Sequence, residues 1–301
     1  MSDIWLNGVL LPDDRATVSI YDSAMMYGDS VFEMLRTFNG RHFKVDEHLA
    51  RLQNSAWTLG LPIPEALPQL DGLLCYENFR SDDETRTLIT IGRGILPLYE
   101  PLFGQPEPWL MICQYPLRWV IAGKSHLYRD GVHAIESSVR QIPGNCIPSH
   151  IKHHNRIHFR LAEMEVQRQD PDAWALVLDQ NGCIAEATGA NLFIVRHGYL
   201  MTPGKNCLPG ISRNFVLDLA RSLGITTLDY ITPSMLRKAD EAFFTCTPYS
   251  IVPCTRFNGA PIGDGKVGSI THSLTRAWCE LVDCDFVAQA EKWDAERSKS
   301  N

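Results

Sequence analysis

Four Asn-Gly pairs and one His-Gly pair constrain the fold of this chain more than any other feature of its sequence. Asn-Gly is a preferred pair in two-residue β-hairpins, because both turn positions need positive φ angles. The pairs are Asn7-Gly8, Asn39-Gly40, Asn181-Gly182, His197-Gly198 and Asn258-Gly259. They stand between short apolar segments, so the sequence predicts β-strands joined by tight turns along the whole chain.

Helices interrupt these strands at irregular intervals. Apolar residues recur at helical spacing in several segments, and Asp46 is a candidate N-cap for the first of them. The predicted helices are about 46–59, 64–79, 151–168, 211–223 and 267–282. The predicted strands are about 31–38, 85–92, 109–115 and 125–139, three between 174 and 202, and 226–230, 242–246 and 251–257. Without a regular βαβ alternation, this order favours an α+β fold over a Rossmann fold.

Length and composition limit the domain organisation and the class of protein that this chain can form. A chain of 301 residues predicts two domains: a small α+β domain at 1–116, a linker at 117–123 and a large domain at 124–290. The remaining polar tail, 291–301, is expected to fray. The formal charge of −7 argues against nucleic-acid binding, and no apolar run is long enough to span a membrane. Nine scattered cysteines and no signal-peptide pattern favour a reducing cytoplasm over a disulfide framework.

Lys152 is the candidate for covalent chemistry. It follows Pro148, which breaks regular structure, and the sequence places it in the first turn of the predicted 151–168 helix. There the positive end of the helix dipole would disfavour its charge, and burial would disfavour it further. A neutral amine of this kind can form an imine with an aldehyde. On these residues alone, a solvated lysine at a helix start is the favoured interpretation, because lysine is usually exposed.

Two further patterns suggest ligand binding. Gly210, Ile211 and Ser212 open the predicted 211–223 helix, whose backbone N–H groups and serine hydroxyl would suit an anion; simple capping is the alternative. His150, His154 and His158 stand at helical spacing and raise a metal-site hypothesis. No carboxylate is interleaved with them, so the sequence favours no metal and histidines that flank a pocket.

Several motifs together resemble the fold-type IV pyridoxal-phosphate (PLP) enzymes, the class IV aminotransferases. The resemblance covers about residues 4–278, with the motifs in the family's order. It includes Ile151-Lys152-His153-His154-Asn155-Arg156, the segment from Ile184 to Phe193, and Leu208-Pro209-Gly210-Ile211. The family contains branched-chain and D-amino-acid aminotransferases, R-selective amine transaminases and 4-amino-4-deoxychorismate lyase. The resemblance implies a two-domain α+β fold like that of the D-amino-acid aminotransferases.

The resemblance also implies a PLP site. Lys152 would carry the cofactor, and Glu186 would face its pyridine nitrogen. Asn191 matches a position that supports this site, and Arg156 is a hypothetical partner of the cofactor's phenolic oxygen, because Ile157 replaces the family's tyrosine. The predicted phosphate ligands are Arg51, Gly210, Ile211, Ser212 and Thr247. Alone, Arg51 would be interpreted as a surface residue and Glu186 as an exposed strand-end residue.

The subgroup signature is mixed. Met34 stands where the lyase has its catalytic threonine, and Leu98 and Glu100 stand where the D-amino-acid enzyme has an arginine and a histidine that bind the substrate carboxylate. The positions that match the substrate pocket of the branched-chain enzymes are Tyr27, Phe32, Arg36 and Arg86. Pro248 and Tyr249 replace two small residues at the carboxylate turn, where a tyrosine would narrow the pocket or redirect the carboxylate.

These features imply a PLP-dependent aminotransferase with an amino acid or primary amine as donor and a 2-oxo acid as acceptor. A branched-chain donor is favoured, and a D-amino acid or an R-configured amine is the alternative. Lys152 would move the proton between the substrate Cα and the cofactor. The rival hypotheses are the lyase, which releases pyruvate without an acceptor, and a non-enzymatic metal- or ligand-binding protein. The resemblance further implies a homodimer.

Overall fold

The computed structural model describes residues 3–64 and 83–300, and the chain divides into two compact units. The first unit comprises Met1–Trp119 with Ile151–Arg156, and the second comprises Val120–His150 with Ile157–Asn301. The domain boundaries predicted at 116, 123 and 290 stay a prediction. The predicted helix at 64–79 falls almost entirely outside the described residues.

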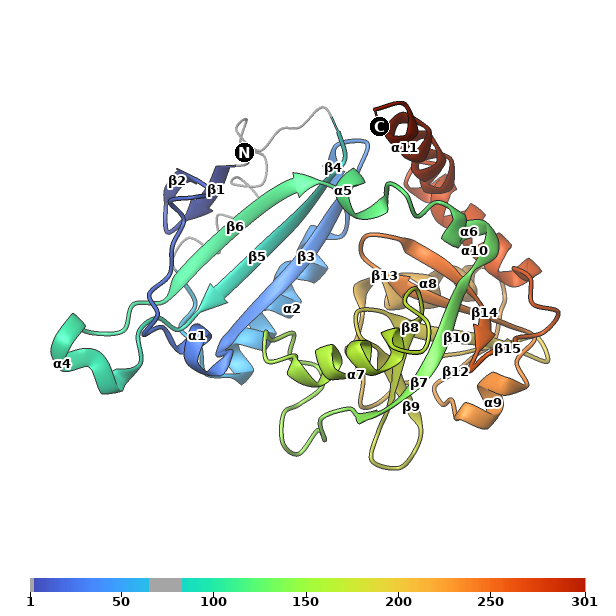
Figure 1. Cartoon of the computed structure of the whole chain (residues 1–301), viewed down its shortest axis with the longest axis horizontal. Helices are drawn as coiled ribbons and strands as arrows, with labels where there is room; N and C mark the ends of the chain where they lie inside the picture. The colour runs from blue at the N-terminus through green and yellow to red at the C-terminus, as the bar shows by residue number, and fades with distance from the viewer. Residues whose placement is uncertain (1–2, 65–82, 301) are drawn as a thin grey trace. The chain divides into compact units, whose positions relative to one another are not determined.

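The first unit is built on a six-stranded antiparallel sheet in the order β2-β1-β6-β5-β3-β4 (Figure 1). Its strands are β1 (Asp3–Leu6), β2 (Val9–Pro12), β3 (Ser30–Phe38), β4 (Arg41–His42), β5 (Thr85–Gly92) and β6 (Trp109–Pro116). The helical elements in its described residues are α1 (Ser23–Tyr27), α2 (Val45–Thr58), η3 (Pro97–Tyr99), α4 (Glu100–Phe103) and the start of α5 (Arg118–Ile121). The hairpins predicted at Asn7-Gly8 and Asn39-Gly40 are confirmed, because β1 pairs with β2 and β3 pairs with β4 across them.

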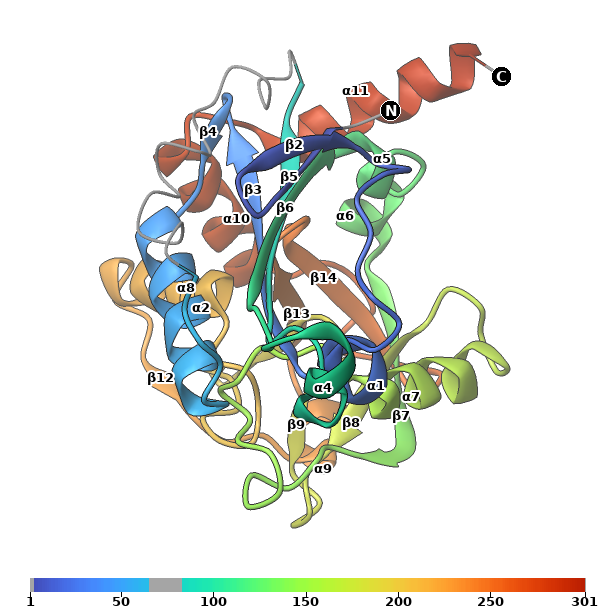
Figure 2. The same ribbon diagram turned by 90° about the vertical axis from the view of Figure 1, so that its left-hand side faces the viewer.

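Helix α2 packs along β3 on one face of this sheet, as Figure 2 shows with the sheet seen nearly edge-on. Leu52 and Ala56 are fully buried there, as their helical spacing predicted. The predicted N-cap is wrong by two residues. Lys44, in the left-handed region with φ 56°, precedes the helix and makes no capping hydrogen bond, and Asp46 lies inside the first turn.

The second unit is built on a nine-stranded mixed sheet. Its order is β12-β11-β10-β13-β14-β7-β8-β9, and β15 pairs with β14. The strands are β7 (Val132–Arg140), β8 (Trp174–Leu178), β9 (Ile184–Ala187), β10 (Asn191–Arg196), β11 (Tyr199–Met201), β12 (Thr227–Leu228), β13 (Glu241–Cys246), β14 (Ser250–Phe257) and β15 (Ala260–Pro261). Helices and strands mix without a regular βαβ order, which confirms the predicted α+β class.

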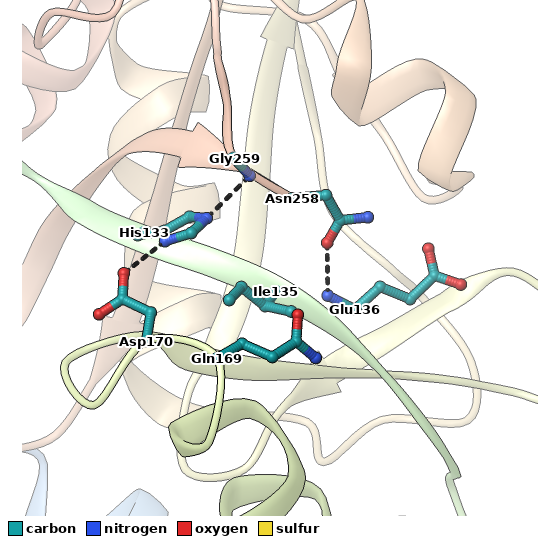
Figure 3. Close-up of a pocket in the computed structure, with 7 residues that line it drawn as sticks. All are labelled: His133, Ile135, Glu136, Gln169, Asp170, Asn258 and Gly259. Carbon is teal, nitrogen blue, oxygen red and sulfur yellow. Dashed lines mark hydrogen bonds and ion pairs between the residues drawn. The ribbon is translucent and has the colours of Figure 1, made fainter.

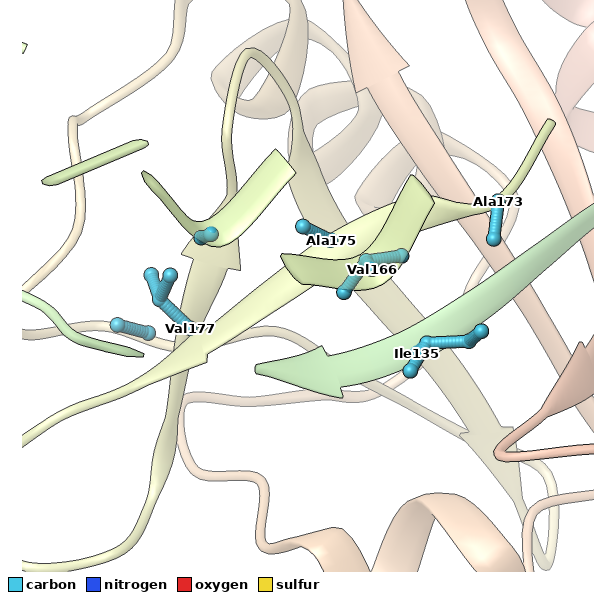
Figure 4. Close-up of a cluster of buried hydrophobic side chains, with 7 residues drawn as sticks. Ile135, Val166, Ala173, Ala175 and Val177 are labelled. Carbon is cyan, nitrogen blue, oxygen red and sulfur yellow. The ribbon is translucent and has the colours of Figure 1, made fainter. Parts of the chain in front are cut away.

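The described part of the second unit has the helices α6 (His126–Asp130), α7 (Ile157–Gln167), α8 (Ile211–Ser222), α9 (Pro233–Arg237), α10 (Ser269–Leu281) and α11 (Phe286–Ser300). Helices α6, α7, α8 and α10 contact the strands of the sheet. Helix α7 packs on β7 and β8 through a buried cluster that includes Ile135, Val166 and Val177 (Figure 4). Burying each of these side chains contributes about 1.5–3 kcal/mol, so the cluster holds the apolar face of α7 against the sheet.

Three predictions in this unit are wrong. Four strands rather than three lie between 174 and 202, because a tight turn closed by an Ala187–Ala190 bridge separates β9 from β10. The strand predicted from 125 begins at Val132, because helix α6 precedes it. The C-terminal tail is not frayed. It forms α11, in which Phe286, Ala290 and Trp293 are buried along one stripe.

Candidate active site

The segment that carries Lys152 is extended, and its backbone is anchored to β3 and α2. The Lys152 carbonyl accepts a hydrogen bond from the Phe32 N–H at 2.9 Å, and the Lys152 N–H donates to Ser55 Oγ at 3.2 Å. The His154 N–H donates to the Ser30 carbonyl at 3.1 Å, and an isolated bridge joins His153 to Val31. The sequence therefore predicted the wrong local structure here. Helix α7 begins at Ile157, so the helix-dipole argument for Lys152 does not hold.

The same geometry excludes the predicted alignment of three histidines. His150 and His154 precede α7 and only His158 lies on it, so the three do not share a helix face. Among the described residues, no group of three or more His, Cys, Asp or Glu side chains is arranged to hold a metal ion.

Cationic and aromatic side chains surround the Lys152 amine. Its Nζ lies 4.6 Å from the centroid of the Phe32 ring, and the guanidinium carbon of Arg156 lies 5.7 Å from the same centroid. The His154 ring stacks on Phe32 at 4.3 Å, and its Nδ1 lies 2.9 Å from Ser30 Oγ. Desolvation and the charges of Arg156 and Lys152 lower the pKa of His154 to about 4, although the residue keeps an exposed edge.

His153 has a lowered pKa for the same reasons, and its buried Nδ1 has no hydrogen-bond partner among the residues that the structure describes. Both histidines are therefore neutral near pH 7. The remaining positive charges at this position belong to Lys152 and Arg156. An anionic group that brings hydrogen-bond acceptors and donors would suit this environment.

The predicted substrate residues on the first sheet share one face. Side chains alternate along a strand, so Phe32, Met34 and Arg36 point to the same side of β3. Arg36 lies directly opposite Arg86 of β5 in the register of the two strands. Like charges placed opposite each other are destabilising unless an anion or another partner compensates them.

Both arginines make contacts within this face. The guanidinium carbon of Arg36 lies 3.8 Å from the Phe38 ring centroid, and its Nε donates to the Thr37 carbonyl at 3.1 Å. Arg86 Nε contacts the Met34 sulfur at 2.9 Å. Arg36 is buried, whereas Arg86 is partly exposed.

Tyr27 ends helix α1 close to the lysine segment. Its carbonyl accepts a hydrogen bond from Asn155 Nδ2 at 3.3 Å, and its side chain is exposed. Gly28 follows with φ 67°, and a Cβ there would meet Asn155 at 3.2–3.3 Å. A glycine at this position allows α1 to approach the residue three positions beyond Lys152.

Arg51 lies on α2 in a buried ionic cluster. Its Nε and Nη2 donate to the two oxygens of Glu33 at 2.6 and 2.8 Å, and His48 Nδ1 lies 2.6 Å from the same carboxylate. Glu33 is fully buried. Burial opposes its charge, but Arg51 and His48 outweigh this and lower the pKa of Glu33 to about 2. The sequence did not indicate Glu33, which holds the guanidinium of Arg51 in one orientation.

In the second unit, Glu186 of β9 is buried, and its carboxylate accepts hydrogen bonds. The Leu208 N–H lies 3.2 Å from both carboxylate oxygens, and Gln141 Nε2 donates to Oε1 at 2.7 Å. Donors to both oxygens favour the ionised carboxylate. Burial and the charge of Glu186 raise the pKa of the nearby Cys207 to about 12, so this thiol stays neutral.

Asn191 and the start of α8 form a second feature of this unit. Asn191 Nδ2 donates to the Leu208 carbonyl at 2.9 Å, and a Cβ on Gly210 would come within 2.0 Å of Asn191 Oδ1. Gly210 precedes α8 in an extended conformation, and no side chain among the described residues caps it. The helix therefore begins with Ile211 and Ser212 N–H groups available for an anion.

Thr247, Pro248 and Tyr249 form the turn between β13 and β14. The Tyr249 ring is buried near Trp174 and Tyr128, and its hydroxyl donates to the Val120 carbonyl at 3.0 Å. This contact does not favour a direct role of the hydroxyl in substrate binding. Thr247 and Pro248 are partly exposed.

A separate pocket of about 420 Å³ lies on the second unit and contains none of the predicted site residues. It is lined by His133, Ile135, Glu136, Gln169, Asp170, Asn258 and Gly259. His133 Nδ1 bonds Asp170 at 2.7 Å, and its Nε2 accepts from the Gly259 N–H at 2.9 Å (Figure 3). Because both ring nitrogens are used, His133 serves to hold the Asn258-Gly259 turn.

The family model described as amino-transferase class IV matches residues 30–257. This match covers most of the chain. The chain belongs to the class IV aminotransferase family. It is thus a PLP-dependent enzyme, and the lysine, the ionised buried carboxylate and the uncapped helix start are groups that fit PLP.

Relatives and solved structures agree with this assignment. The branched-chain-amino-acid aminotransferase of Escherichia coli K12 is 30% identical over 303 residues, which cover 96% of this chain and 95% of that protein. A solved branched-chain amino acid aminotransferase with pyridoxamine 5′-phosphate, from T.th., has a TM-score of 0.83 at 30% identity, covering 93% and 94% of the two chains. The branched-chain aminotransferase of Thermoproteus uzoniensis with norvaline has a TM-score of 0.82 at 28% identity, covering 97% of each chain. The predicted fold type is confirmed.

Proposed function

We propose that this aminotransferase moves the amino group between a branched-chain amino acid and a 2-oxo acid, with Lys152 as its catalytic residue. The observation that carries the role of Lys152 is its anchoring: main-chain hydrogen bonds to β3 and α2 fix its backbone, and its amine lies over Phe32. The branched-chain preference is supported by the relatives and solved structures above.

When bound, PLP supplies an electron sink that makes the substrate Cα–H acidic. Lys152 would bind the cofactor aldehyde and, once released by the substrate amine, would accept the Cα proton at Nζ and return it to the cofactor side. Arg156 would interact with the phenolic oxygen. His153 and His154, being neutral, would add no further positive charge there.

Glu186 would meet the protonated pyridine nitrogen. Its carboxylate is buried and accepts N–H donors on both oxygens, so it stays ionised and can hold a proton on that nitrogen. Asn191 would position this site by holding the Leu208 carbonyl.

The phosphate would bind the backbone N–H groups at the start of α8. Gly210 allows close approach there, Ile211 and Ser212 supply donors, and the Thr247 hydroxyl would add another. Arg51 would contribute its charge while Glu33 keeps its guanidinium oriented.

Arg36 and Arg86 would bind a substrate carboxylate. Their placement opposite each other on one sheet face concentrates positive charge, which an anionic substrate group would compensate. Phe32 and Tyr27 would provide apolar contacts, and Pro248 and Tyr249 would shape the pocket without a hydroxyl contact.

A visible absorption spectrum of the purified holoenzyme tests the proposal. Addition of L-leucine should bleach the band of the lysine-bound cofactor and produce the spectrum of the amine form, and a 2-oxo acid should restore it. D-alanine and an R-configured arylamine serve as stereochemical controls. Bleaching by those compounds but not by L-leucine would refute the substrate assignment. Continuous pyruvate release from added 4-amino-4-deoxychorismate, with no amino acceptor present, would support the lyase instead.

The enzyme would act as a homodimer. Exposed apolar side chains gather on α1 and α4, including Met25 (71% exposed) and Leu102 (74% exposed). Tyr21, which precedes α1, stacks on Phe103 of α4 at 4.9 Å between ring centroids, and so connects the two exposed groups of side chains. Such a patch suits a second copy of the chain. Light scattering of Leu102→Asp should show a lower mass than wild type; an unchanged dimer would exclude this patch as the interface.

A cytoplasmic location is also proposed. Within 3–64 and 83–300, no helix is long and apolar enough to cross a membrane. The eight cysteines in the described part of the chain are all free thiols, which agrees with a reducing compartment.

A further inference from the structure

Gln141 connects Glu186 to helix α7 through its side-chain amide. It directly follows β7 and is buried. Its backbone N–H donates to the Leu178 carbonyl at 2.9 Å, and its own carbonyl accepts from Gln180 Nε2 at 2.7 Å. Since both main-chain groups are hydrogen-bonded, the position from which the side chain extends is fixed.

The orientation of this amide follows from its neighbours. Gln141 Oε1 accepts the Ile142 N–H at 3.1 Å, so the oxygen must face that donor. The amide nitrogen then faces Glu186 at 2.7 Å and donates to it. The reverse orientation would set an oxygen against the carboxylate and an amino group against the Ile142 N–H.

His158 completes the chain. Its Nε2 lies 2.9 Å from Gln141 Oε1, and because this oxygen can only accept, Nε2 must carry a hydrogen. His158 lies in the first turn of α7, whose packing on β7 and β8 fixes the ring beside Gln141. Every hydrogen bond therefore points the same way, from His158 to Gln141 and from Gln141 to the carboxylate.

We propose that Gln141 and His158 are positioning residues that keep Glu186 ionised and oriented toward the cofactor's pyridine nitrogen, and that they thereby keep this nitrogen protonated. This inference rests on the proposed role of Glu186. A carboxylate that loses its N–H donor gains affinity for a proton. It would then compete more strongly for the proton that it shares with the pyridine nitrogen, so that nitrogen would be less fully protonated, which weakens the electron sink without changing how the substrate is bound.

Gln141→Leu removes the donor with little change in volume, and Glu186→Gln removes the charge itself. The matched control is Gln114→Leu, because Gln114 is equally buried but lies in the first unit, on β6. For each variant, the visible spectrum of the holoenzyme, the dissociation constant for PLP, and kcat and KM for the amino donor are measured. Circular dichroism of each variant shows that it is folded.

Gln141→Leu should shift the visible band in the same direction as Glu186→Gln and lower kcat about 10- to 100-fold, the range for losing a hydrogen bond to a charged group. KM for the donor should change less than about threefold, and Gln114→Leu should show none of these effects. His158→Phe should produce a weaker version of the same shift. His158→Gln, which retains an N–H donor, should shift the band less than His158→Phe does.

Combining Gln141→Leu with Glu186→Gln decides whether the glutamine acts through the carboxylate. The double variant should be no worse than Glu186→Gln alone, because the charge that Gln141 supports is already absent. Fully additive losses, or a wild-type spectrum for Gln141→Leu, would overturn the inference while the role of Glu186 stands. A Glu186→Gln variant with wild-type spectrum and kcat would instead refute the proposed function of Glu186, and this inference with it.

Discussion

Replacing Glu33 with glutamine should destabilise the protein more than any other single change to its charged residues that we consider. Glu33 is fully buried, and its two oxygens bind Arg51 in a bidentate pair while one also bonds His48. Glutamine has one acceptor oxygen and would place an amino group against these donors. Arg51 would then keep a buried charge without its counter-charge.

The magnitude follows from the pKa of Glu33. A decrease from 4.5 to about 2 corresponds to about 3 kcal/mol at ~1.36 kcal/mol per unit, which agrees with the ~3–5 kcal/mol usual for breaking a buried pair. Because the folded-state pKa lies below the unfolded one, this contribution is complete above about pH 4.5 and is lost as the pH falls toward about 2. The variant should therefore differ most from wild type near neutral pH.

Thermal unfolding of Glu33→Gln, followed by circular dichroism at several pH values, measures this loss. At roughly 2–4 °C per kcal/mol for a chain of this size, the midpoint should fall by about 6–12 °C near pH 7. Glu47→Gln is the control, because Glu47 makes an exposed pair with Lys44 at 2.7 Å, and such pairs contribute less than about 1 kcal/mol. Equal losses in the two variants, or a Glu33→Gln effect that persists undiminished at pH 3, would refute the reasoning.

Three other variants test separate parts of the structure. Lys152→Ala should abolish turnover in a donor assay while circular dichroism shows a folded chain; substantial remaining turnover would exclude Lys152 as the catalytic residue. His42→Gln should reduce the loss of stability between about pH 6.5 and 4, by up to about 3 kcal/mol, because burial lowers the pKa of His42 to about 4 and only the unfolded state takes up a proton in that range; parallel stability–pH curves would contradict this. Arg86→Met should raise KM for L-leucine about 10- to 100-fold and leave kcat nearly unchanged, whereas an effect confined to kcat would argue against carboxylate binding.

Local sequence signals predicted much of the fold. The hairpins at Asn7-Gly8 and Asn39-Gly40 formed because the turn residues alone impose their geometry. The apolar face of α2 was visible because Leu52 and Ala56 repeat at helical spacing. Family membership was predictable as well, because the motifs around Lys152 and Glu186 are contiguous in the sequence.

Interactions between distant residues were not predictable in this way. Nothing near Glu33 in the sequence indicates that Arg51, eighteen residues later, meets it in a bidentate pair. The chain from His158 through Gln141 to Glu186 likewise joins three separate elements. The helix α11 was missed because most of its residues are polar or charged, so composition suggested a polar tail although Phe286, Ala290 and Trp293 recur at helical spacing.

The extended conformation at Lys152 changes the physical account of the candidate active site. A lysine in a helix's first turn would owe its electrostatic environment to the backbone dipole, which acts within about one turn. Here Lys152 lies five residues before the start of α7, and its backbone N–H and carbonyl bond to α2 and β3, so Lys152 does not lie in the first turn where that dipole acts. The environment is set by side chains instead: Arg156 supplies a fixed positive charge, while His153 and His154 remain neutral. Because the main chain is held at both ends of the residue, the amine can move only by rotation of its own side chain, which is the motion that binding and releasing an aldehyde requires.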